Sequence, residues 1–452
     1  MKAKLTFFVC LLLSLGLVYS VGAFDFGVNI ENDSSYSSKE GEGFIQENTG
    51  HLWMNHVLGD YWVFNASLMG TFSSNSDKPI LYGDVEILTL KGTFPNLENG
   101  ASLFSIEMGR FFHQEFSNYV FSHRMDGIRM EFGYSWSTLQ MAFGYTGLLN
   151  KYYTSLVLSR LDGLEDLDKD KLWAPPRFIG SLSLSMPELF ARQNVTLSVL
   201  VNEDLRHLFD DKVIKEGKET FDPSSGGLVD TQYFGVGLDG PLTSSLFYTA
   251  FAYLGTGRIL TFVPDTQSNT GEAYNYKLIF SGMGGVSLRY YLAEFFQSVA
   301  GLQIVYATGD SDTITFLEGN TSGNSSMFLP ISGASLGSAL QFKPSNLLAT
   351  ELSYSLKPFS AVKGFLLESL QAGTRLTPLF KASKGAMSEG GVDPSKGAGY
   401  VGTDLALFAN LRPFSDLGLG VTLGIFLPNG SAFLPGKDET VVYGQFVFSF
   451  SF

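Results

Sequence analysis

The chain has 452 residues, of which 50 are glycine, 14% are aromatic and only 16% are charged. This composition favours short, tightly turned strands over helices, which would be richer in Ala, Glu and Lys. The formal net charge of −14 and the absence of a basic stripe argue against nucleic acid as a partner.

The first residues have the pattern of a secretory signal. Two lysines precede the apolar run Leu5–Val18, and small residues follow it up to Ala23. The sequence therefore predicts a signal peptide over 1–23, cleaved near Ala23, and a mature protein over 24–452. Because the only cysteine lies within the signal, we expect no disulfide and no thiolate metal ligand in the mature chain.

The charged positions of one segment change face at Gly127. Arg124 and Asp126 alternate before this glycine, whereas Arg129 and Glu131 alternate after it, with a shift of one residue. A β-bulge at Gly127 would absorb this shift, so the sequence predicts one there. The expected lumen-facing residues are Arg124, Asp126, Arg129 and Glu131. The expected lipid-facing residues are Phe121, His123, Met125, Ile128, Met130 and Phe132.

The densest acidic segment of the chain follows in a predicted loop and contains Asp162, Glu165, Asp166, Asp168 and Asp170. The spacing of its last three aspartates matches the start of a calcium-binding loop. However, Lys171 occupies the position that needs glycine, and Arg177 the position that needs a bidentate glutamate. We therefore predict no metal site here and interpret the segment as a solvated acidic loop.

Several segments of about ten residues alternate between apolar and polar positions. The pattern is regular in Arg177–Met186, Leu348–Lys357, Tyr400–Arg412 and Leu417–Leu427. After residue 23 no apolar run approaches the ~20 residues of a helical membrane span. The sequence therefore predicts a single all-β domain, a transmembrane antiparallel β-barrel surrounded by outer-membrane lipid. A soluble β-sandwich is the alternative, but its exterior would be more charged.

The number of strands follows from the connections, because short and long ones must alternate along an outer-membrane barrel. A first count gives nineteen strands, since Ser332–Phe342 has the pattern of one. An odd number would leave the two ends of the barrel domain on opposite sides. Treating 309–346 as one long external excursion and 358–365 as a periplasmic turn gives about 18 strands, with 16 to 20 left open.

The last segment, Thr440–Phe452, alternates between aromatic and small polar residues. On a soluble sheet edge such a strand would promote aggregation, whereas in lipid it suits a strand that closes a barrel. We expect it to pair with the strand that begins at Phe24 and to be the part read by the barrel-assembly machinery. The residues expected to carry this closing and assembly signal are Tyr443, Phe446, Phe448, Phe450 and Phe452.

Four short stretches resemble an outer-membrane family. Gly109-Arg110, Arg124–Arg129, Gly402–Leu405 and Phe426–Gly430 are similar to motifs of the alginate-export type of porin-like channel. The resemblance implies an 18-stranded barrel, in agreement with the strand count, and transport of an anionic polysaccharide.

The charges predicted to face the lumen do not suit a polyanion, which would require a positive excess along its path. Seven acidic and seven basic side chains are expected there. They are Asp84, Glu86, Glu107, Asp126, Glu131, Glu351 and Asp404, against Arg124, Arg129, Arg177, Arg289, Lys357, Arg375 and Arg412. A balanced lumen favours hydrated solutes of either sign, although ion pairs that brace the wall would give the same count.

No catalytic constellation is evident in the sequence. The five histidines have no nucleophile identifiable beside them, and we find no phosphate-binding loop or zinc spacing. We therefore predict a non-enzymatic channel without a cofactor, in which small hydrophilic solutes diffuse through a lumen narrowed by Ser311–Asn346. Two alternatives stay open. One is a surface adhesin mounted on a sealed barrel, and the other is an exporter or importer of a specific polysaccharide or apolar solute.

Overall fold

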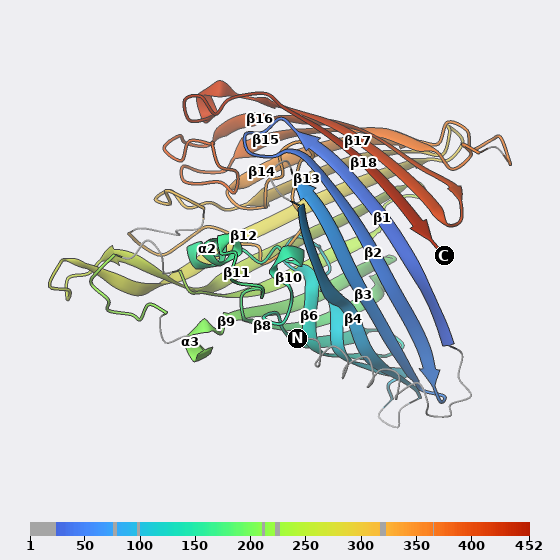
Figure 1. The fold of residues 1–452 in the computed structure, drawn as a ribbon, viewed down its shortest axis with the longest axis horizontal. Coiled ribbons are helices and arrows are strands. Elements are labelled where there is room, and N and C mark those ends of the chain that lie inside the picture. Colours follow the sequence, from blue (N-terminus) through green and yellow to red (C-terminus); the bar gives the residue numbers. More distant parts are fainter. Residues whose placement is uncertain are drawn as a thin grey trace.

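The computed structural model of the chain describes residues 24–75, 79–96, 100–209, 213–221, 227–316, 322–364 and 366–452. The predicted signal at 1–23 lies outside these residues. Eighteen antiparallel strands each pair with the next along the chain, and β18 pairs with β1, so the sheet closes into a barrel (Figure 1). The predicted fold and the count of 18 strands are confirmed.

The first nine strands are β1 (Phe24–Ser37), β2 (Gly43–Leu58), β3 (Trp62–Asn75), β4 (Pro79–Pro95), β5 (Leu103–Gln114), β6 (Ser122–Gly133), β7 (Thr138–Tyr145), β8 (Arg177–Phe190) and β9 (Gln193–Asp204). The remaining strands are β10 (Val229–Pro241), β11 (Leu246–Pro264), β12 (Glu272–Leu292), β13 (Ser298–Ala307), β14 (Leu347–Leu356), β15 (Gln371–Lys381), β16 (Gly399–Phe414), β17 (Leu417–Pro428) and β18 (Val441–Ser451). Short helical segments are η1 (Lys151–Tyr153), α2 (Arg160–Leu167), α3 (Arg206–Phe209) and η2 (Gly430–Ala432).

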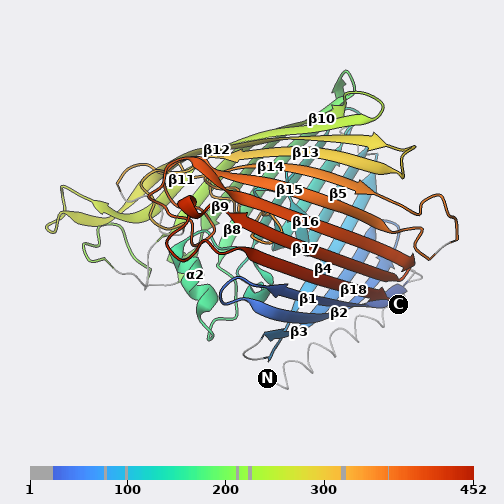
Figure 2. The same cartoon turned by 90° about the horizontal axis from the view of Figure 1, so that it is seen from above.

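Short turns gather at one end of the barrel and long connections at the other (Figure 1). Figure 2 shows α2 and the extended β11–β12 hairpin at the long-connection end. The described residues of 308–346 contain no strand, so this segment is one long excursion, as predicted. Among the described residues, none of the helices is both long and apolar enough to cross a membrane.

Side chains alternate between the two faces of the wall, as the period-two pattern predicts. In β16, Leu405 and Leu407 are exposed on the outer face, whereas Asp404 and Ala406 are buried inside. The lumen at the long-connection end contains apolar clusters, in which Phe328, Ile331 and Phe342 of the excursion pack against the inner wall. The core of this protein therefore lies inside its barrel, at one end.

The β5–β6 hairpin leaves the barrel wall above Arg110. Pairing of β4 with β5 stops at Leu88–Arg110, and pairing of β6 with β7 stops at Asp126–Tyr145. The hairpin itself continues to Gln114–Ser122, so its tip has no neighbouring strand in the described residues. It bends inward instead, and its apolar residues join the core inside the barrel.

Two facing glycines allow this departure from the wall. Gly109 has a φ of +118° and pairs directly with Gly127. A Cβ atom at Gly109 would collide with the Leu88 carbonyl, and one at Gly127 with the Phe143 carbonyl. Glycine is needed at both positions because the neighbouring backbones approach so closely.

The predicted bulge at Gly127 is wrong. The register of β6 with both neighbouring strands passes through this residue without a shift. Phe121, His123 and Met125 do not face lipid but are buried, each less than 10% exposed, within or beside the interior core. The positions of the charged residues shift at Gly127 because the hairpin enters the lumen there, where both of its faces contact protein. A register shift does occur in β4, at Glu86.

Candidate channel constriction

The excursion between β13 and β14 forms backbone hydrogen bonds with the inward-folded tip of the β5–β6 hairpin. The N–H groups of Ile331 and Ser332 donate to the Val120 carbonyl at 2.9 and 3.1 Å. Ser122 N–H donates in return to the Ser332 carbonyl at 3.0 Å, and Ala334 N–H to the Asn118 carbonyl at 2.8 Å. These backbone bonds join two connections that are far apart in sequence into one internal layer.

The β5–β6 connection also contacts the barrel wall at β11. The Glu115 carboxylate accepts hydrogen bonds from the N–H groups of Ser117 and Val120 and from the Tyr253 hydroxyl of β11. The Phe116 ring stacks on Tyr253 with centroids 5.3 Å apart. Glu115 thus holds the turn closed while its neighbours fix the turn to β11, so the connection spans the lumen.

Asp404 of β16 anchors the far end of the excursion. Its carboxylate accepts hydrogen bonds from the N–H groups of Ser338 at 3.0 Å, Ala339 at 2.8 Å and Leu340 at 3.4 Å. A carboxylate that accepts several N–H bonds is held strongly. Only 1% of Asp404 is exposed. This residue therefore holds a loop. Contrary to the sequence prediction, it does not line a water-filled pore.

Replacing Asp404 with alanine should free the tip of the excursion. We expect a loss of about 1.5–3 kcal/mol, the usual contribution of hydrogen bonds to a charged group, and a larger single-channel conductance in planar bilayers. Asp404→Asn keeps one acceptor oxygen and should show a smaller increase. Unchanged conductance in the alanine variant would show that the excursion holds its place without this anchor.

The excursion leaves one side of the lumen open. Inner-face residues from β10 to β17 are buried beneath or beside it, and they include Tyr233, Tyr253, Met283, Val305, Ala349, Ala406 and Phe426. By contrast, Asp33 of β1, Glu47 of β2 and Tyr443 of β18 stay partly exposed. The remaining aperture therefore lies against the arc where the barrel closes.

Cavities on both sides of the constriction border this arc. One of about 1210 Å³ lies on the outer side, between Lys39, Leu340, Glu389 and Tyr443 among others. Another of about 490 Å³ follows the inner faces of β15–β18 and includes Gln445. Tyr443 and Gln445 are successive inner-face residues of β18. The two cavities thus approach one another along this strand.

Arg110 closes the seam that the departing hairpin leaves in the wall. Its guanidinium donates to Asp84 at 2.6 Å and to both Asp126 oxygens at 2.8 and 2.9 Å. It also donates to the carbonyls of Val85 and Leu148 at 2.9 and 2.8 Å. One side chain therefore connects three strands and a loop where strand pairing is missing.

The segment around η1 fills the same seam. Asn150 N–H donates to Asp84 at 2.9 Å, and its side-chain amide donates to the Gly83 carbonyl at 3.2 Å. The Tyr153 hydroxyl donates to Thr71 of β3 at 2.9 Å. The bond to Gly83 satisfies a backbone carbonyl of β4 where β5 no longer pairs with this strand, as a wall in contact with lipid requires.

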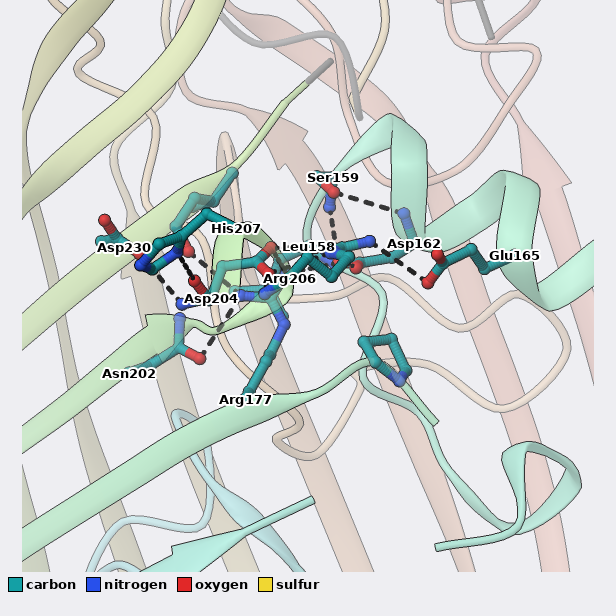
Figure 3. Close-up of polar contacts among 12 residues, drawn as sticks. Leu158, Ser159, Asp162, Glu165, Arg177, Asn202, Asp204, Arg206, His207 and Asp230 are labelled. Atoms are coloured by element: carbon teal, nitrogen blue, oxygen red, sulfur yellow. Dashed lines mark hydrogen bonds and ion pairs between the residues drawn. The ribbon is translucent and has the colours of Figure 1, made fainter. Parts of the chain in front are cut away.

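A buried ion cluster fixes α2 to the ends of β8 and β9 (Figure 3). The Arg177 guanidinium donates to Asp162 at 2.7 Å and to the Val229 carbonyl at 3.0 Å. Arg206 donates to both Asp162 and Asp204. Neither Arg177 nor Asp162 has more than 1% of its surface exposed. Arg177 is therefore not a pore-lining residue, and the acidic segment is not fully solvated, contrary to the sequence prediction.

Asp162 serves both the helix and the cluster. Its carboxylate accepts from the N–H groups of Leu158 and Ser159, while its own N–H donates to the Ser159 hydroxyl, which forms a capping box at the start of α2. Burial alone would raise the pKa of Asp162, but the Arg177 and Arg206 guanidiniums lower it to about 2. Burial would lower the pKa of Arg206, but the carboxylates of Asp162, Asp204 and Glu165 keep it above its ordinary value.

Most of the other predicted lumen residues lie in local contacts. Glu107 pairs with Arg129, whose guanidinium also lies over the Phe111 ring. Arg124 lies over the Tyr153 ring, and Glu86 accepts from Ser67 and contacts His51. Gln140 donates weakly to Glu131 at 3.4 Å, and Arg375 lies over Phe408. Arg289 and Arg412 are exposed, while Glu351 and Lys357 are partly exposed.

The sequence prediction missed the charges closest to the aperture. Asp25, Glu31 and Asp33 of β1 and Glu47 of β2 occupy the positions that alternate with the exposed apolar residues of these strands, such as Phe26, Ile30 and Phe44. They therefore belong to the inner face. The alternation of β1 could have revealed them, but the count of lumen charges began at Asp84. With these four carboxylates included, that count is no longer balanced.

The terminal strand β18 pairs with β1 and β17 over nearly its whole length. Phe446, Phe450 and Phe452 are exposed, as are outward residues of the neighbouring strands, and Phe448 is partly exposed. Inside, the Gln445 amide donates to Asp33 at 2.7 Å. Phe452 bonds back to Val28, which completes the pairing of β18 with β1.

Comparison with known proteins finds the same fold in solved structures. Pseudomonas aeruginosa OccK5 (OpdH) superposes with a TM-score of 0.57 at 12% identity, covering 95% of this chain and 97% of that one. Acinetobacter baumannii OccAB3 gives 0.53 at 11% identity, covering 95% and 99%. The outer membrane protein OprD from Pseudomonas aeruginosa gives 0.52 at 10% identity, covering 95% and 93%. No family model and no curated protein matches, so the resemblance to the alginate-export type stays a prediction.

Proposed function

We propose that this protein is a porin-like channel of a bacterial outer membrane, through which small hydrophilic solutes diffuse passively. The observation that carries the proposal is a closed barrel whose own connections fold inward beside β10–β17, with cavities on both sides of them along β18. Inward-folded connections narrow a path to the size of small solutes without sealing it. The same fold in an outer membrane protein supports the location.

The proposal includes the remaining sequence predictions. The segment 1–23 acts as a signal cleaved near Ala23, and the aromatic face of β18 is the element read by the assembly machinery. Glu107, Arg129 and Glu131 face the lumen below the constriction, where they contact hydrated solutes or brace the wall. No chemical step is assigned to any residue, in keeping with a channel that is not an enzyme.

Reconstitution into planar bilayers tests the proposal. We expect stepwise single-channel currents in KCl, because cavities lie on both sides of the constriction along the same strand. Swelling of proteoliposomes in isotonic solutions of sugars of increasing size should then give the size limit. A folded barrel that carries no current and admits no sugar would favour the alternative of an adhesin mounted on a sealed barrel.

A further inference from the structure

The aperture adjoins an arc of the wall whose strands carry carboxylates but no lysine or arginine. β18, β1, β2 and β3 contain no lysine or arginine in their sequences. Their acidic residues are Asp25, Glu31, Asp33 and Glu47, all on inner-face positions. Elsewhere around the wall, several acidic side chains have cationic neighbours, such as Glu107 with Arg129 and Asp230 with Arg258. A wall of one charge sign concentrates the opposite ion beside it.

Asp33 and Glu47 are directly opposite one another on neighbouring strands. Like charges in this arrangement destabilise a sheet, so their placement carries a cost in stability. Neutral donors hold both in place: Gln445 donates to Asp33 at 2.7 Å, and the Tyr82 hydroxyl to Glu47 at 3.3 Å. Lys39, at the outer cavity, is itself paired with Glu42 and Glu389. Because their donors are neutral, Asp33 and Glu47 keep a negative charge that can attract a passing solute.

We infer that the permeation route follows the inner face of β18, β1 and β2, and that Asp33 and Glu47 determine its specificity for cations and for small solutes bearing an ammonium group. The excursion packs against the inner wall of β10–β17, so a solute that passes the constriction does so beside the acidic arc. This inference rests on the proposed channel function and adds to it a route and a charge preference. It replaces the balanced lumen expected from the sequence.

The double variant Asp33→Asn with Glu47→Gln tests the route. Both amides keep the shape of the side chain and an oxygen that can accept from Gln445 and Tyr82, so the barrel should fold. In planar bilayers under a KCl gradient, we expect the unmodified protein to prefer K⁺. The K⁺/Cl⁻ permeability ratio of the double variant should be several-fold lower than that of the unmodified protein. A heat-dependent shift in gel mobility verifies that the variant barrel is folded.

The control is Glu131→Gln, which removes one carboxylate from the inner face of β6, away from the proposed route. We expect this variant to change the permeability ratio much less than either Asp33→Asn or Glu47→Gln alone. The preference of the unmodified protein should also weaken between 0.1 and 1 M KCl, as the screening length falls from ~10 to ~3 Å.

The possible failures are distinct. Absence of current from the folded, unmodified protein contradicts the channel function itself. Normal currents whose permeability ratio changes no more in the double variant than in Glu131→Gln overturn the route while leaving the channel intact. A preference for Cl⁻ in the unmodified protein also overturns it, and would place the route beside the exposed Arg289 of β12.

Discussion

Replacing Arg110 with methionine should lower the free energy of unfolding by about 3–5 kcal/mol, the usual cost of removing one partner from a buried ion pair. The substitution leaves the carboxylates of Asp84 and Asp126 without their cation in the wall of the barrel. It also removes the donor that satisfies the carbonyls of Val85 and Leu148. Urea unfolding in detergent micelles, followed by tryptophan fluorescence, measures the effect.

Arg289→Met is the matched control for the Arg110 variant. It removes the same charge from an exposed position that forms no ion pair with any residue the structure describes, so the expected change is within about 0.5 kcal/mol. If the two variants unfolded at the same urea concentration, the seam between β4 and β5 would be held by the η1 segment alone. Increased leakage of the Arg110 variant in bilayers would further indicate that the wall has opened there.

Replacing Asp162 with asparagine should cost about 3 kcal/mol at neutral pH and detach α2 from the rim of the barrel. The amide cannot balance Arg177 and Arg206, which are both buried. Asp166→Asn, an exposed change in the same helix, should leave stability nearly unchanged. Limited proteolysis within 160–173 together with urea unfolding distinguishes the two variants.

The same carboxylate makes stability depend on pH. The pKa of Asp162 is lowered in the folded state from its ordinary 3.8 to about 2. Its contribution is therefore complete above pH 3.8 and is lost as the pH falls through about 2, and it amounts to about 2 kcal/mol. Unfolding experiments between pH 5 and pH 2 should show this loss in the unmodified protein, and a smaller loss in Asp162→Asn. Equal pH dependence in both proteins would contradict the assignment.

The period-two pattern of the strands was sufficient to predict the fold. In β16 and β17 most outward positions are apolar and most inward ones are small or polar, because lipid and lumen impose opposite requirements on alternate residues. The number of strands followed from parity once the excursion at 309–346 was treated as one connection. Both predictions depend on patterns along the sequence and not on contacts between distant residues.

The internal layer could not be predicted in the same way. Phe121 and Met125 fit the alternation of a lipid-facing strand, yet Phe121 pairs with Ser332 and both side chains lie inside the barrel. An apolar side chain is stable both in lipid and in a protein core, so the alternation of apolar residues does not distinguish the two surroundings. Arg110 was likewise missed as a site residue, because its role arises only where β4 and β5 separate.

The contact between Gln445 and Asp33 joins residues 412 positions apart in the sequence. The strands that border the aperture are thus the first and the last of the barrel, and they meet only when the sheet closes. Such distant pairing is entropically costly and forms late. An unfinished barrel therefore has a lumen but no defined conduit, and cation preference in an assembling population should develop only as the barrels close.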